Sequence, residues 1–302
     1  MPNQQPYRGR FAPSPTGLLH FGSLIAAMGS YLQAKQRGGE WFVRIDDIDP
    51  PREQAGAKDN ILFTLEQFGF EWDGPVFYQS HNFKRYQAAV DDLVKRQLAY
   101  PCSCSRAQII KKANQVKGHI IYPGYCRTGP LEKSAEHSIR LRCDKETIVF
   151  NDAIQGEQSI NLDTSMGDFI IQRRDQLFSY HLASAIDDAE QGITEVVRGA
   201  DLLGCTPNQL HLQHSLNLPS PEYCHLPVVI NAAGQKLSKQ THAEPVNAKD
   251  SVVLLYKTLK FLGQMPPINL IKGSQEDIWQ WAKTHWQLDL VPPNNIRMDS
   301  PE

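Results

Sequence analysis

Apolar residues in the first hundred positions alternate between short continuous runs and the spacing of a helix face. A run at residues 8–12 precedes a turn rich in proline and glycine, and a second run follows at 41–45; both predict strands. Helical spacing is found at Leu24, Ile25, Met28 and Leu32, and again around 61–68 and 86–98. Strands that alternate with helices of this length are typical of parallel βαβ units.

The pattern changes after residue 100. The segment from 100 to about 150 is rich in cysteine, glycine, tyrosine and lysine, and its β-like runs are short, at 138–142 and 147–150. The alternation then returns, with strands expected at 169–172, 194–198 and 227–231 and helices around 180–187 and after Pro207. Two more helices are expected near the end, one after Asp250 and one from Ser274, where Asp277 three residues later forms a capping-box pattern.

These patterns predict an α/β protein in which an insertion separates two halves of one domain. The four expected segments are 1–99 for the first half, 100–150 for the insertion, 151–245 for the second half and 246–302 for a short helical tail. The length of 302 residues fits this division, because a domain typically takes about 150 residues.

Composition narrows the class of protein. A hydrophobic content of 41% can bury a core, which excludes a disordered or fibrous chain. The net charge of −2 argues against a general nucleic-acid coat but allows a local basic face. One such stretch runs from Arg106 to Arg127 and contains five Lys or Arg and no Asp or Glu.

Export and membrane insertion are not predicted. Residues 1–10 are polar, and apolar runs such as 252–256 are far shorter than the ~18 residues that span a bilayer. Six unevenly spaced cysteines do not make a disulfide scaffold in a chain of this length. We therefore expect a cytoplasmic protein with reduced thiols, and a monomer.

Residues 10–23, with the sequence RFAPSPTGLLHFGS, have the chemistry of a phosphate site. A strand and a turn lead into a helix that opens at Gly22 and Ser23, where free backbone N–H groups and the helix dipole favour an anion. His20, just before this helix, is suited to donate to a phosphate oxygen.

A second candidate is the run KLSKQ at 236–240. Lys236 and Lys239 can neutralise charge that develops on a leaving pyrophosphate. Each run alone is weak evidence, because a histidine after a turn is more often structural and a Lys-x-x-Lys pair is more often solvated surface. Their joint occurrence at opposite ends of an α/β domain is much more specific.

The two runs resemble the HIGH and KMSKS motifs of class I aminoacyl-tRNA synthetases, with Ser23 for the second His and Leu237 for the Met. Three runs resemble glutamyl-tRNA synthetases in particular: RFAPSPTG at 10–17, RIDDID at 44–49 and EVVRGADLL at 195–203. The resemblance covers roughly residues 8–242. It implies a Rossmann-like catalytic domain with its ligands at the carboxyl ends of parallel strands.

The resemblance also implies roles for single residues. Catalysis is expected of His20, Lys236 and Lys239, and ATP, with Mg²⁺, is expected to contact Pro13, Ser14, Gly17, His20, Gly22, Ser23 and Lys239. Glutamate is expected to contact Arg10, Phe11, Ala12, Pro13, Ser14, Asp46, Tyr180 and Arg198. Guanidinium groups suit the carboxylates of glutamate, and Asp46 suits its ammonium although it is one methylene shorter than the usual Glu. Arg173 and Arg174 are as compatible with a structural or RNA-facing role as with catalysis.

Cys102, Cys104 and Cys126 form a candidate zinc site. Spacing alone would favour His119 or His137 as the fourth ligand. A family of truncated glutamyl-tRNA synthetase paralogues instead has a Cys-x-Cys…Tyr-x-x-x-Cys pattern, which implies Tyr122 and one structural Zn²⁺ per chain. We expect Cys143, Cys205 and Cys224 to be small buried apolar residues.

That same family fits the length of the chain, because only about 60 residues follow Gln240 and full glutamyl-tRNA synthetases have helical anticodon-binding domains there. The resemblance implies that glutamate is activated by ATP without tRNA and is attached to the queuosine base in the anticodon of tRNA(Asp). Two alternatives stay open: a minimal synthetase that charges the 3′ end of tRNA(Glu), and a catalytically silent tRNA-binding paralogue.

Overall fold

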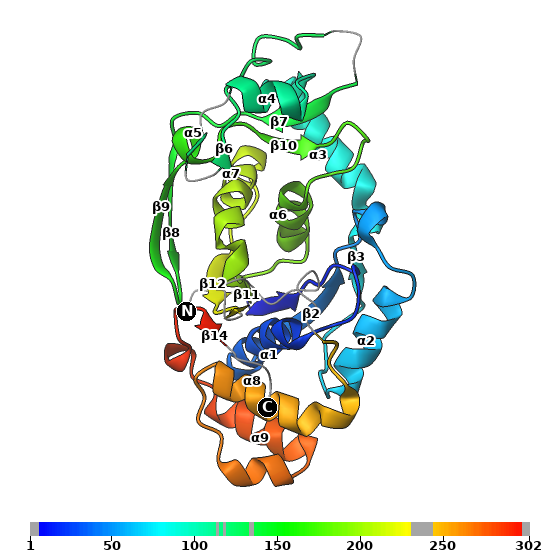
Figure 1. The fold of residues 1–302 in the computed structure, drawn as a ribbon, viewed down its shortest axis with the longest axis vertical. Coiled ribbons are helices and arrows are strands. Elements are labelled where there is room, and N and C mark those ends of the chain that lie inside the picture. The colour runs from blue at the N-terminus through cyan, green and yellow to red at the C-terminus, as the bar shows by residue number, and fades with distance from the viewer. Residues whose placement is uncertain (1–5, 113–114, 117–118, 133–135, 231–243, 298–302) are drawn as a thin grey trace.

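The computed structural model describes residues 6–112, 115–116, 119–132, 136–230 and 244–297. The molecule is elongated (Figure 1). The tail helices lie at one end, the parallel sheet and α1 come next, two helices of the second half follow, and α4 lies at the other end.

Five parallel strands form the centre of the α/β domain: β1 (Arg8–Phe11), β2 (Glu40–Ile45), β3 (Phe77–Tyr78), β11 (Glu195–Gly199) and β12 (Glu222–Leu226). Strand β2 pairs with β1 and β3, and β11 pairs with β12. Thr194 donates its backbone N–H to the carbonyl of Arg8 at 2.9 Å, which makes β1 and β11 neighbours. The three strands β3-β2-β1 and the pair β11-β12 therefore meet where β1 and β11 begin, and the prediction of an α/β fold with parallel strands is confirmed.

The main hydrophobic core lies between this sheet, helix α1 (Phe21–Gln36) and the tail helices α8 (Ser251–Phe261) and α9 (Gln275–His285). Trp279 of α9 donates its indole N–H to the Phe68 carbonyl at 2.9 Å. Trp286 donates to Gln33 of α1 at 3.0 Å. The tail thus shares its core with the first half of the α/β domain. The expected capping box at Ser274 and Asp277 is present.

A second core lies further along the molecule, where helices α3 (Phe83–Lys95), α6 (Tyr180–Glu190) and α7 (Thr206–Leu216) meet a three-stranded antiparallel sheet. Its strands are β10 (Phe169–Gln172), β7 (Ser138–Leu141) and β4 (Ala99–Cys102), in that order. Strand β7 of the expected insertion therefore pairs with β10 of the second half. The hairpin of β8 (Thr147–Asp152) and β9 (Gly156–Asn161) reaches back to β12, where Asp152 pairs with Tyr223.

The remaining elements cover the periphery: α2 (Ala57–Gln67), α4 (Arg106–Lys112), β5 (Gln115–Val116), β6 (His119–Ile120), α5 (Leu162–Ser165), β13 (Val229–Ile230) and β14 (Ile296–Arg297). No helix in the described part of the chain is long and apolar enough to cross a membrane. All six cysteines are free thiols, and five of them are buried.

The strand expected at 227–231 is wrong in its position. The sheet strand at this point is β12, which ends at Leu226, and Pro227 follows it with no N–H to continue the ladder. Only Val229 and Ile230 are extended again, and they pair with β14 near the end of the described chain.

Candidate active site

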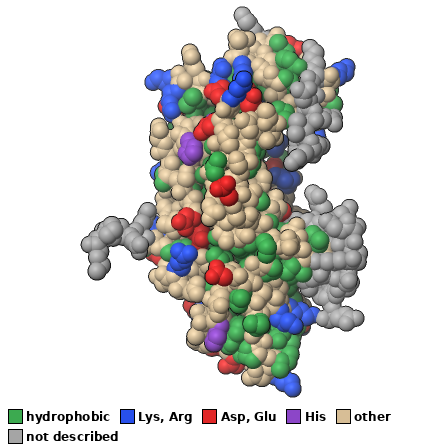
Figure 2. Space-filling model, turned by 90° about the vertical axis from the view of Figure 1, so that its left-hand side faces the viewer, with side chains coloured by type: hydrophobic (Ala, Val, Ile, Leu, Met, Phe, Trp, Pro, Cys, Tyr) green, Lys and Arg blue, Asp and Glu red, His purple; other side chains and the backbone are tan. Residues whose placement is uncertain are grey.

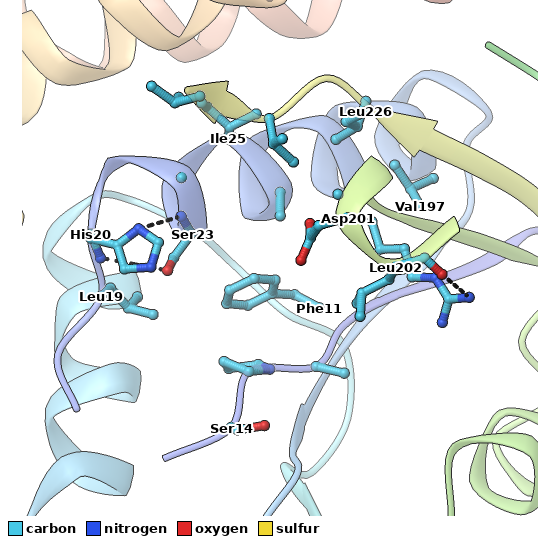
Figure 3. A pocket seen from close by; sticks show the side chains of 18 of the residues that line it. Phe11, Ser14, Leu19, His20, Ser23, Ile25, Val197, Asp201, Leu202 and Leu226 are labelled. Atoms are coloured by element: carbon cyan, nitrogen blue, oxygen red, sulfur yellow. Dashed lines mark hydrogen bonds between the residues drawn. The ribbon is translucent and has the colours of Figure 1, made fainter. Parts of the chain in front are cut away.

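A cavity of about 560 Å³ opens at the carboxyl ends of β1, β11 and β12, in front of the first turn of α1. Figure 3 shows His20 and Ser23 on one side of this cavity, Val197 and Leu202 on the opposite side, and the ring of Phe11 between them. Most of the residues expected at the nucleotide and glutamate sites line it: Arg10, Phe11, Ala12, Pro13, Ser14, His20, Gly22, Ser23, Tyr180 and Arg198.

His20 caps the N-terminus of α1. Its Nδ1 accepts the backbone N–H of Ser23 at 3.3 Å, and the Ser23 hydroxyl accepts the backbone N–H of His20 at 3.5 Å. Because an amide can only donate, Nδ1 carries a lone pair and the neutral ring has its proton on Nε2. That tautomer is the one that can donate to a phosphate oxygen at a helix N-terminus.

Gly17 lies in the turn between β1 and α1 with φ +139°, a conformation that requires glycine. Lys236 and Lys239 fall within 231–243, outside the described residues.

Arg198 lies in the wall of the cavity and is 5% exposed. The hydrogen bonds that its guanidinium donates go to neutral acceptors. The bonds to Thr206, Gln209 and His225 are 2.8–3.0 Å long, whereas those to Tyr180 and the Leu202 carbonyl are 3.2 and 3.4 Å. Tyr180 and Leu202 line the cavity, so the longest contacts of the guanidinium are on its cavity side. A carboxylate in the cavity would be a stronger acceptor than either of them.

Arg10 belongs to a buried network of charges behind the cavity. Its Nε donates to Asp188 at 3.1 Å, and Arg44 donates to the same Asp188 oxygen at 2.6 Å and to Asp46 at 2.8 Å. Burial alone would raise the pKa of Asp188, but Arg10 and Arg44 outweigh it and lower that pKa. Burial dominates at Asp46 despite Arg44, and raises its pKa to about 6.

Asp46 lines a second cavity of about 530 Å³. The two cavities share part of their walls, at Ala12, Ser14, Thr16, Tyr180 and Leu202. Arg10 and Arg198 therefore line the same cavity as Tyr180, and Asp46 lines the neighbouring cavity, which Tyr180 also borders.

The three cysteines of the expected metal site lie together, with their Sγ atoms within 4.8 Å of one another, and all three are buried. The Tyr122 hydroxyl is 3.3 Å from Cys102 Sγ and 3.5 Å from Cys104 Sγ, and Cys104 Sγ is 3.6 Å from Cys126 Sγ. Edges of a tetrahedral zinc site with sulfur and oxygen ligands measure about 3.5–3.8 Å. The four side chains thus have an arrangement that suits Zn²⁺, and the three cysteines supply soft sulfur donors.

Hydrogen bonds within and around this cluster favour the thiolate form of one cysteine, Cys126. Burial alone would raise the pKa of the Cys126 thiol, but hydrogen bonds from Tyr122 and from nearby backbone amides outweigh it and lower the pKa to about 6. Burial raises the pKa of Cys104 to about 11. Arg140 lies over the Tyr122 ring at 4.0 Å and donates to Cys102 Sγ at 3.3 Å.

His137, one of the two histidines considered as ligands, does not belong to the cluster. His137 Nε2 lies 3.1 Å from the Glu132 carbonyl, and the side chain of His119 is outside the described residues. Cys143 and Cys224 are buried, whereas Cys205 is half-exposed, unlike the expectation.

The basic stretch that begins at Arg106 does not present all its charge to solvent. Arg127 makes a two-pronged ion pair with the buried Asp168, at 2.6 and 2.7 Å, so its charge is balanced within the protein. Arg106 and Arg174 line an open cavity of about 690 Å³ beside the cysteine cluster, together with Arg140 and Arg173. Figure 2 shows Lys and Arg side chains, interspersed with acidic ones, at this end of the molecule.

Several residues of the site had no signal in the sequence. Asp188 organises both Arg10 and Arg44, and His225 and Thr206 hold Arg198, yet none of them stands in a motif that sequence reasoning used. Asp201, which Figure 3 shows at the cavity, lies inside the run at 195–203 and could have been found from it.

These features define the class of protein. The chain belongs to the class I tRNA synthetases of the E and Q type, whose catalytic-domain model matches residues 7–262.

Its relatives narrow the class further. The chain is 50% identical over 293 residues to the Glutamyl-Q tRNA(Asp) synthetase of Dechloromonas aromatica (strain RCB), covering 96% of this chain and 97% of that protein. It is 47% identical over 286 residues to the protein of the same name from Pseudomonas paraeruginosa (strain DSM 24068 / PA7), covering 95% of each.

A solved structure agrees with the fold. The glutamate tRNA ligase from Elizabethkingia meningosepticum CCUG26117, in complex with its amino acid, superposes with a TM-score of 0.80 at 25% identity. The match covers 97% of this chain and 67% of that one.

Proposed function

We propose that this protein is an ATP-dependent ligase that activates L-glutamate as glutamyl-adenylate and transfers the glutamate to queuosine in the anticodon of tRNA(Asp). The observation that carries the proposal is the match of about half of all residues, over nearly the whole length, to relatives named Glutamyl-Q tRNA(Asp) synthetase. The alternatives, a minimal glutamyl-tRNA synthetase and a silent paralogue, are not favoured by these relatives.

In the first step the α-carboxylate of glutamate attacks the α-phosphate of ATP, and pyrophosphate leaves. We assign the cavity in front of α1 to both reactants. His20 and the N–H groups of the first turn of α1 would hold phosphate oxygens, with Mg²⁺ expected to accompany the ATP. Lys236 and Lys239 would stabilise charge on the leaving pyrophosphate.

Glutamate is assigned to the end of the cavity where Arg10, Arg198 and Tyr180 converge. The buried guanidinium of Arg198 offers its cavity side to a carboxylate, and Asp46 offers a carboxylate to the ammonium. The protein groups form no covalent bond in this step; they bring the reactants into line and stabilise charge.

A first experiment tests activation alone. Glutamate-dependent exchange of pyrophosphate into ATP, measured without any tRNA, is expected for the proposed enzyme. A chain that binds tRNA but shows no exchange would support the silent alternative.

A second experiment tests the acceptor. Labelled glutamate is offered with tRNA(Asp) that carries or lacks queuosine, with tRNA(Glu), and with an isolated anticodon stem-loop of tRNA(Asp) that carries queuosine. Transfer to the queuosine-bearing molecules, stem-loop included, is expected. Transfer only to the 3′ end of tRNA(Glu) would overturn the proposal in favour of the minimal synthetase.

We further propose one structural Zn²⁺ held by Cys102, Cys104, Tyr122 and Cys126. The four buried donor atoms fit the ion, and the cavity assigned to ATP and glutamate is lined by other residues. Metal analysis of purified protein should show about one zinc per chain. An unchanged zinc content in Tyr122→Phe would remove Tyr122 from the ligand set.

The insertion at 100–150 is proposed as the unit that holds this zinc, between catalytic halves at 1–99 and 151–245, with the helical tail at 246–302. The cavity lined by Arg106, Arg140, Arg173 and Arg174 is proposed to face the RNA backbone. Transfer to tRNA should therefore weaken steeply as salt is raised, because phosphate contacts release counterions.

A further inference from the structure

Behind Arg198 lies a chain of buried polar contacts that the proposed chemistry does not use. His225, on β12, is fully buried, and its Nε2 accepts the Nε–H of Arg198 at 3.0 Å. Its Nδ1 lies 2.6 Å from Oδ2 of Asp152, which is 1% exposed at the end of β8. Thr206 completes the group, because its hydroxyl accepts from Arg198 at 2.8 Å and lies 3.2 Å from His225 Nε2.

The chemistry of these contacts fixes the tautomer of His225. A guanidinium can only donate, so Nε2 must be the unprotonated nitrogen of a neutral ring. The proton then sits on Nδ1 and is donated to the Asp152 carboxylate. Burial, followed by the nearby Arg198, outweighs Asp152 and keeps the pKa of His225 below its ordinary value, which agrees with a neutral ring.

Asp152 is itself fixed in one orientation. Its Oδ1 lies within hydrogen-bond distance of three backbone N–H groups, those of Gln155 at 2.8 Å, Ile154 at 3.1 Å and His225 at 3.2 Å. Oδ2 is therefore left to face the ring of His225. The titratable or charged groups around the ring are Asp152, Arg198, Tyr223 stacked on it, and Arg10 at longer range.

We propose that Asp152 and His225 are positioning residues that orient Arg198 toward the substrate carboxylate. Asp152 selects the Nδ1–H tautomer, and the lone pair on Nε2 then holds the Nε side of the guanidinium against the back of the cavity. The side of the Arg198 guanidinium that faces the cavity can then bind the carboxylate of glutamate. This inference rests on the proposed function, because it concerns the affinity for glutamate.

Asp152→Asn tests the tautomer with little change in volume. The three backbone donors require the amide oxygen at the Oδ1 position, so the amide NH₂ must face His225 Nδ1. The Nδ1 atom of His225 then has to accept a hydrogen bond, so the ring proton moves to Nε2. The Nε2–H of His225 and the Nε–H of Arg198 are then two donors that face each other. A wrong tautomer imposed by an Asp-to-Asn change has large effects on histidine function elsewhere.

The first measurement is the nitrogen NMR spectrum of protein labelled at histidine, with the His225 signals assigned by their loss in His225→Gln. The wild type should show a protonated Nδ1 and an unprotonated Nε2, and Asp152→Asn should show the reverse. A wild-type ring protonated on Nε2 would overturn the proposal. This readout needs no glutamate, so its failure is distinct from a failure of the proposed function, which the wild-type exchange assay reveals.

The second measurement is the KM for glutamate and for ATP in pyrophosphate exchange. Asp152→Asn should raise the glutamate KM about tenfold or more, since a charge-assisted contact is misdirected, while the ATP KM stays within about twofold. The matched control is Asp59→Asn, on the exposed face of α2. Equal rises in both KM values, or an unchanged glutamate KM, would contradict the proposal.

Two variants of Thr206 test the orientation of Arg198 independently, in case Asp152→Asn does not fold. Thr206→Val removes the hydroxyl that Arg198 and His225 share, and Thr206→Ser keeps it. The valine variant should raise the glutamate KM, and the serine variant should restore it to near the wild-type value. Similar glutamate KM values in the two variants would show that the hydroxyl does not orient Arg198.

Discussion

The affinity for glutamate should depend on pH through Asp46. Asp46 is 6% exposed, and burial raises the pKa of its carboxyl group to about 6 although Arg44 donates to it at 2.8 Å. An ammonium ion pairs only with the ionised form. We therefore expect the affinity for glutamate to be high above pH 6 and to fall progressively below pH 6. Binding of glutamate is then coupled to loss of a proton from Asp46.

The size of the effect follows from the titration. With a pKa of about 6, Asp46 is about half ionised at pH 6 and about one-tenth ionised at pH 5. The glutamate KM should thus be about twofold above its alkaline value at pH 6 and about elevenfold above it at pH 5. A carboxyl group with an ordinary pKa would change the KM by less than about 10% over the same range.

The assay is pyrophosphate exchange at saturating ATP between pH 5 and 8, with the KM for ATP followed in parallel. The matched control ligand is 2-hydroxyglutarate, a competitor that keeps both carboxylates and has no ammonium, so its inhibition constant should not follow Asp46. Asp46→Asn should raise the glutamate KM at high pH and flatten the profile. A glutamate KM that is flat from pH 5 to 7, or an Asp46→Asn variant that keeps the wild-type profile, would show that Asp46 does not bind the ammonium.

Three further outcomes are expected. Lys239→Ala should slow pyrophosphate exchange about 10²–10³-fold while glutamate binding, measured by calorimetry, is nearly unchanged; exchange within threefold of wild type would exclude the assigned role. Cys104→Ser should lose zinc and lower the unfolding temperature of the insertion, whereas Cys205→Ser, a half-exposed thiol outside the cluster, should keep both, as metal analysis and calorimetry would show. Trp279→Ala should lower the free energy of unfolding by about 3–5 kcal/mol, measured by chemical denaturation, because Trp279 is 3% exposed and packs on Tyr31 and Phe70 in the main core. A decrease below about 1 kcal/mol would mean that the tail adds little to the stability of that core.

The order of strands and helices was within reach of the sequence because local patterns encode it. Helical spacing from Leu24 to Leu32 and the apolar run at 41–45 depend only on which faces are buried, and the structure has α1 and β2 at these places. The capping box at Ser274 and Asp277 is likewise a contact between residues three apart. The strand expected at 227–231 is displaced for two reasons: Pro227 ends the β12 ladder, and the pairing of Val229 with Ile296 depends on a segment far away in the sequence.

The sequence by itself determined the chemistry that was available: the turn before α1 that we propose for phosphate, two arginines in recognisable runs, and three cysteines with a tyrosine that we propose for zinc. Only the tertiary structure decided what each charge does. Arg127, Arg10 and Arg198 carry the same guanidinium group, but Arg127 is paired with Asp168, Arg10 shares Asp188 with Arg44, and Arg198 donates to neutral acceptors in the cavity wall. The physical reason is that burial and neighbouring charges decide what an ionised side chain can bind. Those neighbours lie far away in the sequence: Asp168 is 41 residues from Arg127, and Asp188 is 178 residues from Arg10.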